Sequence, residues 1–168
     1  IFTSKKTPNN KVRELLSLIK PRKLNIDHVR IGGNNDGGYL VPNDLKGINY
    51  CFSPGVGNIA KFEEEISQRN IKSFLADYSV NFRSNNPLID FEKKFLGPIS
   101  NDNYISLKDW LVSKIDYENE KDIILQLDVE GDEYDIINSI DLETLKKIRI
   151  LLIEFHNMHY ILDEFYYI

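Results

Sequence analysis

The residues best suited to chemistry are four acidic side chains that directly follow an apolar run. They lie around one glycine in the segment IILQLDVEGDEYDII: Asp128, Glu130, Gly131, Asp132 and Glu133. The run before Asp128 is typical of a buried strand, and Gly131 supplies a flexible corner before a helix that can begin at Asp132. In open α/β sheets ligands bind at the carboxyl ends of strands, so these carboxylates are predicted to meet a ligand.

A glycine turn and a second acidic residue follow two other apolar runs. Gly55 and Gly57 come after the run 48–53, where glycine lets the backbone approach a ligand closely and a helix start directs N–H groups at it. Asp77 follows Gly55 at about the spacing at which an acidic residue accepts hydrogen bonds from ribose hydroxyls. With Ala60 the turn also matches the dinucleotide pattern G-x-G-x-x-A. The pattern predicts a nucleoside-binding edge.

Strand-like and helical patterns alternate along the chain. Strands are expected at 28–31, 39–41, 48–53, 72–76, 91–96, 123–129 and 149–155, and helices at 11–19, 62–70, 107–114, 132–140 and 142–147. This order predicts an α/β fold in three layers, with a doubly wound, mostly parallel sheet. We expect a single domain over 1–168, in which 1–47 form an N-terminal helix and a hairpin cover and 48–168 form the cofactor-binding core.

The segment GGNNDGG lies between the two short strands expected at 28–31 and 39–41. Its glycine, asparagine and aspartate residues indicate a sharp turn. One interpretation is an ordinary tight turn. The other is a hairpin that folds back over the strand ends and covers the cofactor through Asp36, Gly37, Gly38 and Tyr39.

Composition excludes several classes of function. A chain of 168 residues is long enough for one compact domain. The net charge is −5, with basic and acidic residues interspersed, so we do not expect a nucleic acid partner. The single cysteine, Cys51, indicates a reducing, cytoplasmic compartment, and no apolar run is long enough for a membrane span. The aromatic tail Phe165, Tyr166 and Tyr167 would suit a homodimer contact.

The order of four motifs resembles the FkbM-type class I S-adenosylmethionine-dependent methyltransferases. SPGVG, FLADYSV, LQLDVEGDEYDII and LLIEFH carry the resemblance over about residues 50–156, and the block DVEGDEY followed by IEFH is its specific part. It implies a Rossmann-like methyltransferase sheet and O-methylation of a hydroxyl on a sugar or other small molecule, as in glycan or secondary-metabolite modification. The chain ends at Ile168, so the usual closing antiparallel strands are not expected within it.

The resemblance also implies a role for individual residues toward S-adenosylmethionine. Asp77 would hold the ribose hydroxyls, Tyr78 would border the adenine, and Asp128 would contact the positive end of the cofactor or orient the substrate. Glu63 has an alternative role, because a negative charge in the first turn of a helix is stabilised by the helix dipole. The expected cofactor-binding residues are Ser53, Gly55, Gly57, Glu63, Asp77, Tyr78 and Asp128.

An acceptor hydroxyl is a poor nucleophile until its proton is removed. Asp128, Glu130, Glu154 and His156 are available at the strand ends, and His156 is the best general base by its ordinary pKa. We therefore expect His156, Asp128 and Glu130 to be the catalytic residues. A divalent cation is compatible with these oxygen-rich ends but is not favoured, and no metal ligand is assigned. Asp132 and Glu133 also suit a helix start, where negative charge is favourable.

Two other classes of function use the same features. An NAD(P)-dependent oxidoreductase with a Rossmann-like fold would need the same glycine turn and the same acidic residue, Asp77. A non-catalytic nucleoside-binding domain would keep the fold without turnover. Binding of S-adenosylhomocysteine rather than a nicotinamide cofactor would separate the methyltransferase from the oxidoreductase.

Overall fold

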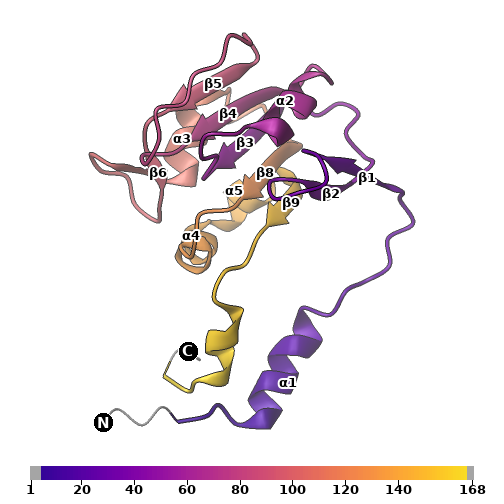
Figure 1. The fold of residues 1–168 in the computed structure, drawn as a ribbon, viewed down its shortest axis with the longest axis vertical. Helices are drawn as coiled ribbons and strands as arrows, with labels where there is room; N and C mark the ends of the chain where they lie inside the picture. Colours follow the sequence, from indigo (N-terminus) through magenta and orange to yellow (C-terminus); the bar gives the residue numbers. More distant parts are fainter. Residues whose placement is uncertain (1–4, 166–168) are drawn as a thin grey trace. The chain divides into compact units, whose positions relative to one another are not determined.

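The computed structural model describes residues 5–165, so Tyr166 and Tyr167 lie outside the described residues (Figure 1). Contacts divide the chain into a larger unit, Ile26–Glu154, and a smaller one formed by Ile1–Asn25 with Phe155–Ile168. In the smaller unit, α1 (Asn9–Leu18) and the 3-10 helix η1 (Met158–Leu162) flank an antiparallel bridge. There the Thr7 N–H donates to the Leu162 carbonyl at 2.9 Å. No helix of the described residues is long and apolar enough to cross a membrane.

A five-stranded sheet forms the centre of the larger unit, and every pairing in it is parallel. The strands lie in the order β5-β4-β3-β8-β9, where β3 is Tyr50–Pro54, β4 Lys72–Ala76, β5 Ile89–Glu92, β8 Ile123–Leu127 and β9 Ile148–Ile153. The strand order therefore reverses between β3 and β8, which is where ligands bind in open α/β sheets. The predicted α/β class and the parallel sheet are confirmed.

One face of the sheet is covered by α3 (Leu107–Lys114) and α4 (Glu133–Ser139), and the short helix α5 (Leu142–Leu145) follows α4 in the chain (Figure 1). Side chains alternate along each strand, so Phe52 and Leu125 face this layer. The Phe52 ring packs edge-on against Trp110 of α3 at a centroid distance of 5.0 Å. Both faces of β8 are covered, so all five of its residues are buried. Four of these residues are apolar, and the exception is Gln126.

The opposite face is covered by α2 (Lys61–Ser67) and by an antiparallel hairpin of β1 (His28–Ile31) and β2 (Tyr39–Pro42) (Figure 1). Ile31 and Val41 of the hairpin join Phe62 and Ile66 of α2 in one core that also includes Cys51 of β3. The hairpin is thus a layer of the fold rather than a peripheral loop. This packing places the turn between β1 and β2 near the carboxyl ends of the strands of the main sheet.

The strand expected at 91–96 is wrong in its extent. Residues 89–92 form β5 in the main sheet, whereas Phe95–Leu96 (β6) pairs with Tyr104–Ile105 (β7) in a separate two-stranded sheet. The two strands are separated by a turn in which the Lys94 N–H donates to the Glu92 carbonyl at 2.9 Å. This turn brings β6 and β7 next to the strand ends.

Leu125 is fully buried at the centre of β8, opposite Phe52 of β3 and Leu151 of β9. Leu125→Ala leaves a cavity in a layer that cannot collapse, so we expect a loss of about 2 to 5 kcal/mol in the free energy of unfolding. Ile99→Ala, at a side chain that is 75% exposed, should change it by less than about 0.5 kcal/mol. Urea denaturation measures both, and similar losses would contradict the packing described here.

Candidate functional site

Two adjoining cavities open at the carboxyl ends of β3, β4 and β8. Both are lined by Gly55, Gly57 and Glu130. The Asp77 cavity has a volume of about 430 Å³ and the Tyr39 cavity about 560 Å³, which is the usual range for small-molecule sites. The site therefore has two compartments that meet at the glycine turn and at the corner after β8.

The first glycine of the turn is required by close packing within the protein rather than by a ligand. Gly55 has φ +80°, and a Cβ atom there would lie 1.7 Å from the backbone oxygen of Asp128. Gly57 has φ +58°, but a Cβ atom there would meet no atom within 4 Å. The close approach of Gly55 is thus to the end of β8, whereas Gly57 borders open space that a ligand can fill.

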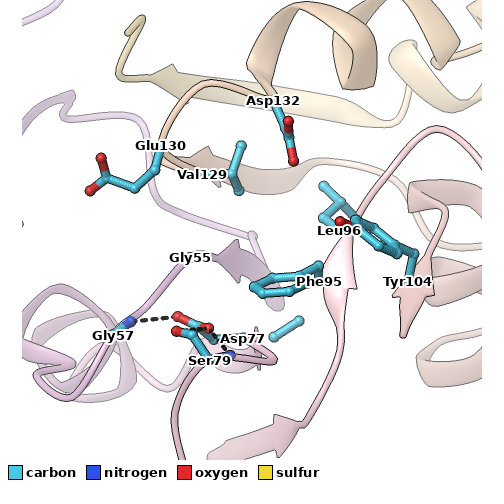
Figure 2. A pocket seen from close by; sticks show the side chains of 11 residues that line it. Gly55, Gly57, Asp77, Ser79, Phe95, Leu96, Tyr104, Val129, Glu130 and Asp132 are labelled. Atoms are coloured by element: carbon cyan, nitrogen blue, oxygen red, sulfur yellow. Dashed lines mark hydrogen bonds between the residues drawn. The ribbon is translucent and has the colours of Figure 1, made fainter. Parts of the chain in front are cut away.

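Asp77 holds the glycine turn in place from the end of β4 (Figure 2). Its carboxylate is 5% exposed and accepts hydrogen bonds from the Gly57 N–H at 3.0 Å and from the Ser79 N–H and hydroxyl at 2.8 and 2.6 Å. A carboxylate can accept about four hydrogen bonds, so these three leave room for one from a ligand. Ser79 was not predicted, although aspartate followed two residues later by serine is a common turn pattern.

The remaining wall of the Asp77 cavity is mainly apolar. Phe95, Leu96 and Tyr104 come from the small β6–β7 sheet, and Val129 comes from the corner after β8 (Figure 2). Tyr78, which was expected beside an adenine, packs its ring on Phe95 at 5.3 Å. A flat aromatic ligand group would meet the β6–β7 side chains, which the sequence did not identify because their strand was misplaced.

The β1–β2 hairpin supplies one side of the Tyr39 cavity, through Asn35, Asp36, Gly37 and Tyr39. The turn before Tyr39 is tightly closed, because a Cβ atom on Gly38 would lie 2.3 Å from the Gly33 carbonyl oxygen. The segment is therefore a tight glycine turn, and its residues also line a cavity at the strand ends. That it covers a cofactor stays a prediction.

Five polar side chains form a linear hydrogen-bond network across the Tyr39 cavity, which we call the Glu63–Asp128 network. The Tyr39 hydroxyl donates to Asp128 at 2.9 Å and accepts from the Gln126 side chain at 3.0 Å. The Gln126 side-chain oxygen accepts from the Ser53 hydroxyl at 2.5 Å, and Ser53 also shares a hydrogen bond with Glu63. Gln126 was not predicted, and Tyr39 was expected only as part of the hairpin cover. The signal for Gln126 was a polar residue inside an apolar strand.

Burial is the largest cause of the pKa shifts in and beside this network. It raises the pKa of Glu63, which is 4% exposed, above that of an ordinary glutamate. Burial and then the charge of Asp128 raise the pKa of Tyr39, so its hydroxyl stays protonated. Burial and then Glu63 raise the pKa of the Cys51 thiol, which fits a packing role for that cysteine.

The four carboxylates of the acidic corner after β8 have different roles. Glu133 is fully buried and accepts hydrogen bonds from the N–H groups of Val129 and Gly131, both at 3.1 Å, so it stabilises the corner itself. Asp132 lines the Asp77 cavity, and Glu130 lines both cavities. The other carboxylate, Asp128, lines the Tyr39 cavity.

Carboxylate oxygens of Asp36, Asp128 and Glu154 lie within 4.8 Å of one another. This spacing would admit a divalent cation, but no second feature of the described residues indicates one, and no metal ligand is assigned. His156 belongs to the smaller unit, and its role as a general base stays a prediction.

Comparison of the chain with protein-family models, curated proteins and solved structures finds no match. The function is therefore proposed from the geometry of the site.

The two glycines of the turn should respond differently to alanine. Gly55→Ala would drive a Cβ atom into the Asp128 backbone, so we expect a loss of more than about 4 kcal/mol in the free energy of unfolding, or no folded protein. Gly57→Ala meets only the cost of a positive φ, about 1 to 2 kcal/mol. Denaturant titration compares the two, and equal midpoints would show that the contact between Gly55 and β8 is not a constraint.

Proposed function

We propose that this protein is an S-adenosylmethionine-dependent methyltransferase that methylates a hydroxyl of a sugar or another small molecule. The observation that carries the proposal is the pair of cavities at the point where the strand order reverses, joined along Gly55, Gly57 and Glu130. A group-transfer enzyme needs two such compartments, one for the donor and one for the acceptor. The order of motifs that resembles the FkbM-type methyltransferases agrees with this division.

The donor fits the Asp77 cavity. A ribose hydroxyl would bind Asp77, and the adenine would pack among Phe95, Leu96 and Tyr104. The methionine portion would then pass Gly57, where the backbone leaves open space, toward the shared wall at Glu130. In this arrangement the sulfonium would reach the boundary between the two cavities.

The charges around the turn favour a cationic cofactor over a dinucleotide. The Tyr39 cavity is lined by the carboxylates of Asp36, Asp128 and Glu130 and by the ammonium group of Lys61. A nicotinamide dinucleotide would place its pyrophosphate at the glycine turn, close to these carboxylates, at an unfavourable Coulomb energy. A sulfonium and an ammonium group would be stabilised in the same place. Among dinucleotide and methionine cofactors, S-adenosylmethionine therefore suits the site better.

Methyl transfer would need little covalent chemistry from the protein. The acceptor oxygen displaces the thioether in line, and the positive charge on sulfur disappears. Correct positioning of the two reactants can supply about 7 to 11 kcal/mol of the barrier. The acceptor proton would pass to a nearby base, for which Asp128, Glu130 and His156 are the candidates.

S-Adenosylhomocysteine should raise the melting temperature of the protein, whereas NADH and NADPH should not. The reason is the carboxylate-lined turn. The amino-acid portion of the first ligand has no net charge, because its ammonium group offsets its carboxylate, whereas the phosphates of the other ligands are anionic and are repelled. A thermal-shift series measures this, followed by methyl transfer from labelled S-adenosylmethionine to a panel of sugars. Stabilisation by a nicotinamide cofactor alone would refute the methyltransferase, and cofactor binding without transfer to any acceptor would favour a binding domain.

Asp77→Asn should weaken binding of S-adenosylhomocysteine by about 10- to 100-fold, because hydrogen bonds to a charged group contribute about 1.5 to 3 kcal/mol. Ser79→Ala serves as a matched control, since it removes one hydrogen bond to the same carboxylate but keeps the charge. Titration calorimetry gives both affinities, and circular dichroism checks that the variants fold. If Asp77→Asn bound as tightly as Ser79→Ala, the ribose would not be held by Asp77.

A further inference from the structure

The Glu63–Asp128 network connects two carboxyl groups through three neutral side chains. Its internal members are Ser53, Gln126 and Tyr39, and consecutive members are joined by four hydrogen bonds. Each hydroxyl has one proton to donate, and the amide donates from its nitrogen and accepts at its oxygen. Every internal member therefore donates to one neighbour and accepts from the other. The direction of a single hydrogen bond fixes the direction of all four.

This pattern sets the smallest number of protons that the two carboxyl groups can hold. If Glu63 and Asp128 were both ionised, two acceptor atoms would face each other at one link, for example at the 2.5 Å contact between Ser53 and Gln126. A protonated carboxyl group has an O–H donor and a C=O acceptor, so one proton is enough to complete the network. A buried polar group without a partner is costly, so the complete network requires at least one protonated end.

Burial decides which end holds the proton. Glu63 is 4% exposed, whereas Asp128 is only partly buried and lines the Tyr39 cavity. Burial disfavours the charged form of a carboxyl group and so raises the pKa of Glu63. The dipole of α2 acts in the opposite direction on Glu63, but α2 has only 7 residues. Glu63 is therefore the protonated end.

We infer that Glu63 is an uncharged carboxylic acid that positions Asp128, through Ser53, Gln126 and Tyr39, as an ionised hydrogen-bond acceptor in the wall of the Tyr39 cavity. The proton of Glu63 is donated to Ser53, and each following donor points toward Asp128. The cavity wall thus presents an acceptor that suits a hydroxyl or an ammonium group of a ligand and disfavours a carboxylate or a phosphate. That this ligand is a methyl acceptor rests on the proposed function, whereas the protonation of Glu63 does not.

Infrared spectroscopy of the ligand-free protein at neutral pH tests the inference. The wild type should show the C=O stretch of a protonated carboxylic acid, and this band should shift when glutamate is labelled with ¹³C at its carboxyl group but not when aspartate is. Glu63→Gln should lose the band and keep the wild-type melting temperature, because the Gln amide can donate to Ser53 in the same direction. Glu64→Gln, at the exposed neighbour on the same helix, should retain the band.

Absence of the acid band from the wild type would overturn the inference. A band that shifts with labelled aspartate would also overturn it, because the proton would then be at the Asp128 end. The labelled wild-type proteins show whether a glutamate or an aspartate holds the proton even if Glu63→Gln does not fold. Because no cofactor or acceptor is present, a failure of methyl transfer would leave the expected band in place, and the two proposals can fail separately.

Discussion

The contact between the glycine turn and the end of β8 is the constraint on which the site depends. Gly55 lies so close to the Asp128 carbonyl that no side chain fits between them. This contact brings the ends of β3 and β8 together at the point where the strand order reverses. It also divides the space above the sheet into two cavities with a common wall. Asp77 then fixes the other end of the turn through Gly57, so the turn is held on both sides.

The balance of charge around this turn gives the site its proposed selectivity. Carboxylates of Asp36, Asp128 and Glu130 line the Tyr39 cavity, and burial raises the pKa of Glu63 beside them. The inferred proton on Glu63 allows a polar network to cross a buried layer without an uncompensated second charge. In this account Asp128 is an ionised hydrogen-bond acceptor where the proposed donor and acceptor meet. Fold and electrostatics thus support the same division of roles between the two cavities.

Much of the fold could be predicted because a parallel sheet covered on both faces requires continuous apolar runs, as in β8. The glycine turn, Asp77 and the hairpin were also visible in the sequence. The contacts of Tyr39 with Gln126 and Asp128 were not, because they join residues 87 and 89 positions apart and depend on how the hairpin packs on α2. The aromatic wall at Phe95 was missed for a similar reason, since a turn determined by tertiary contacts interrupts the expected strand.

A crystal structure of the protein with S-adenosylhomocysteine tests the central claim most directly. The account predicts that the adenine lies among Phe95, Leu96 and Tyr104, that a ribose hydroxyl binds Asp77, and that the homocysteine portion passes Gly57 toward the Tyr39 cavity. The Tyr39 cavity should remain open beside the sulfur atom for an acceptor. A ligand bound away from the glycine turn, or one that fills both cavities and leaves no space beside the sulfur, would contradict the account.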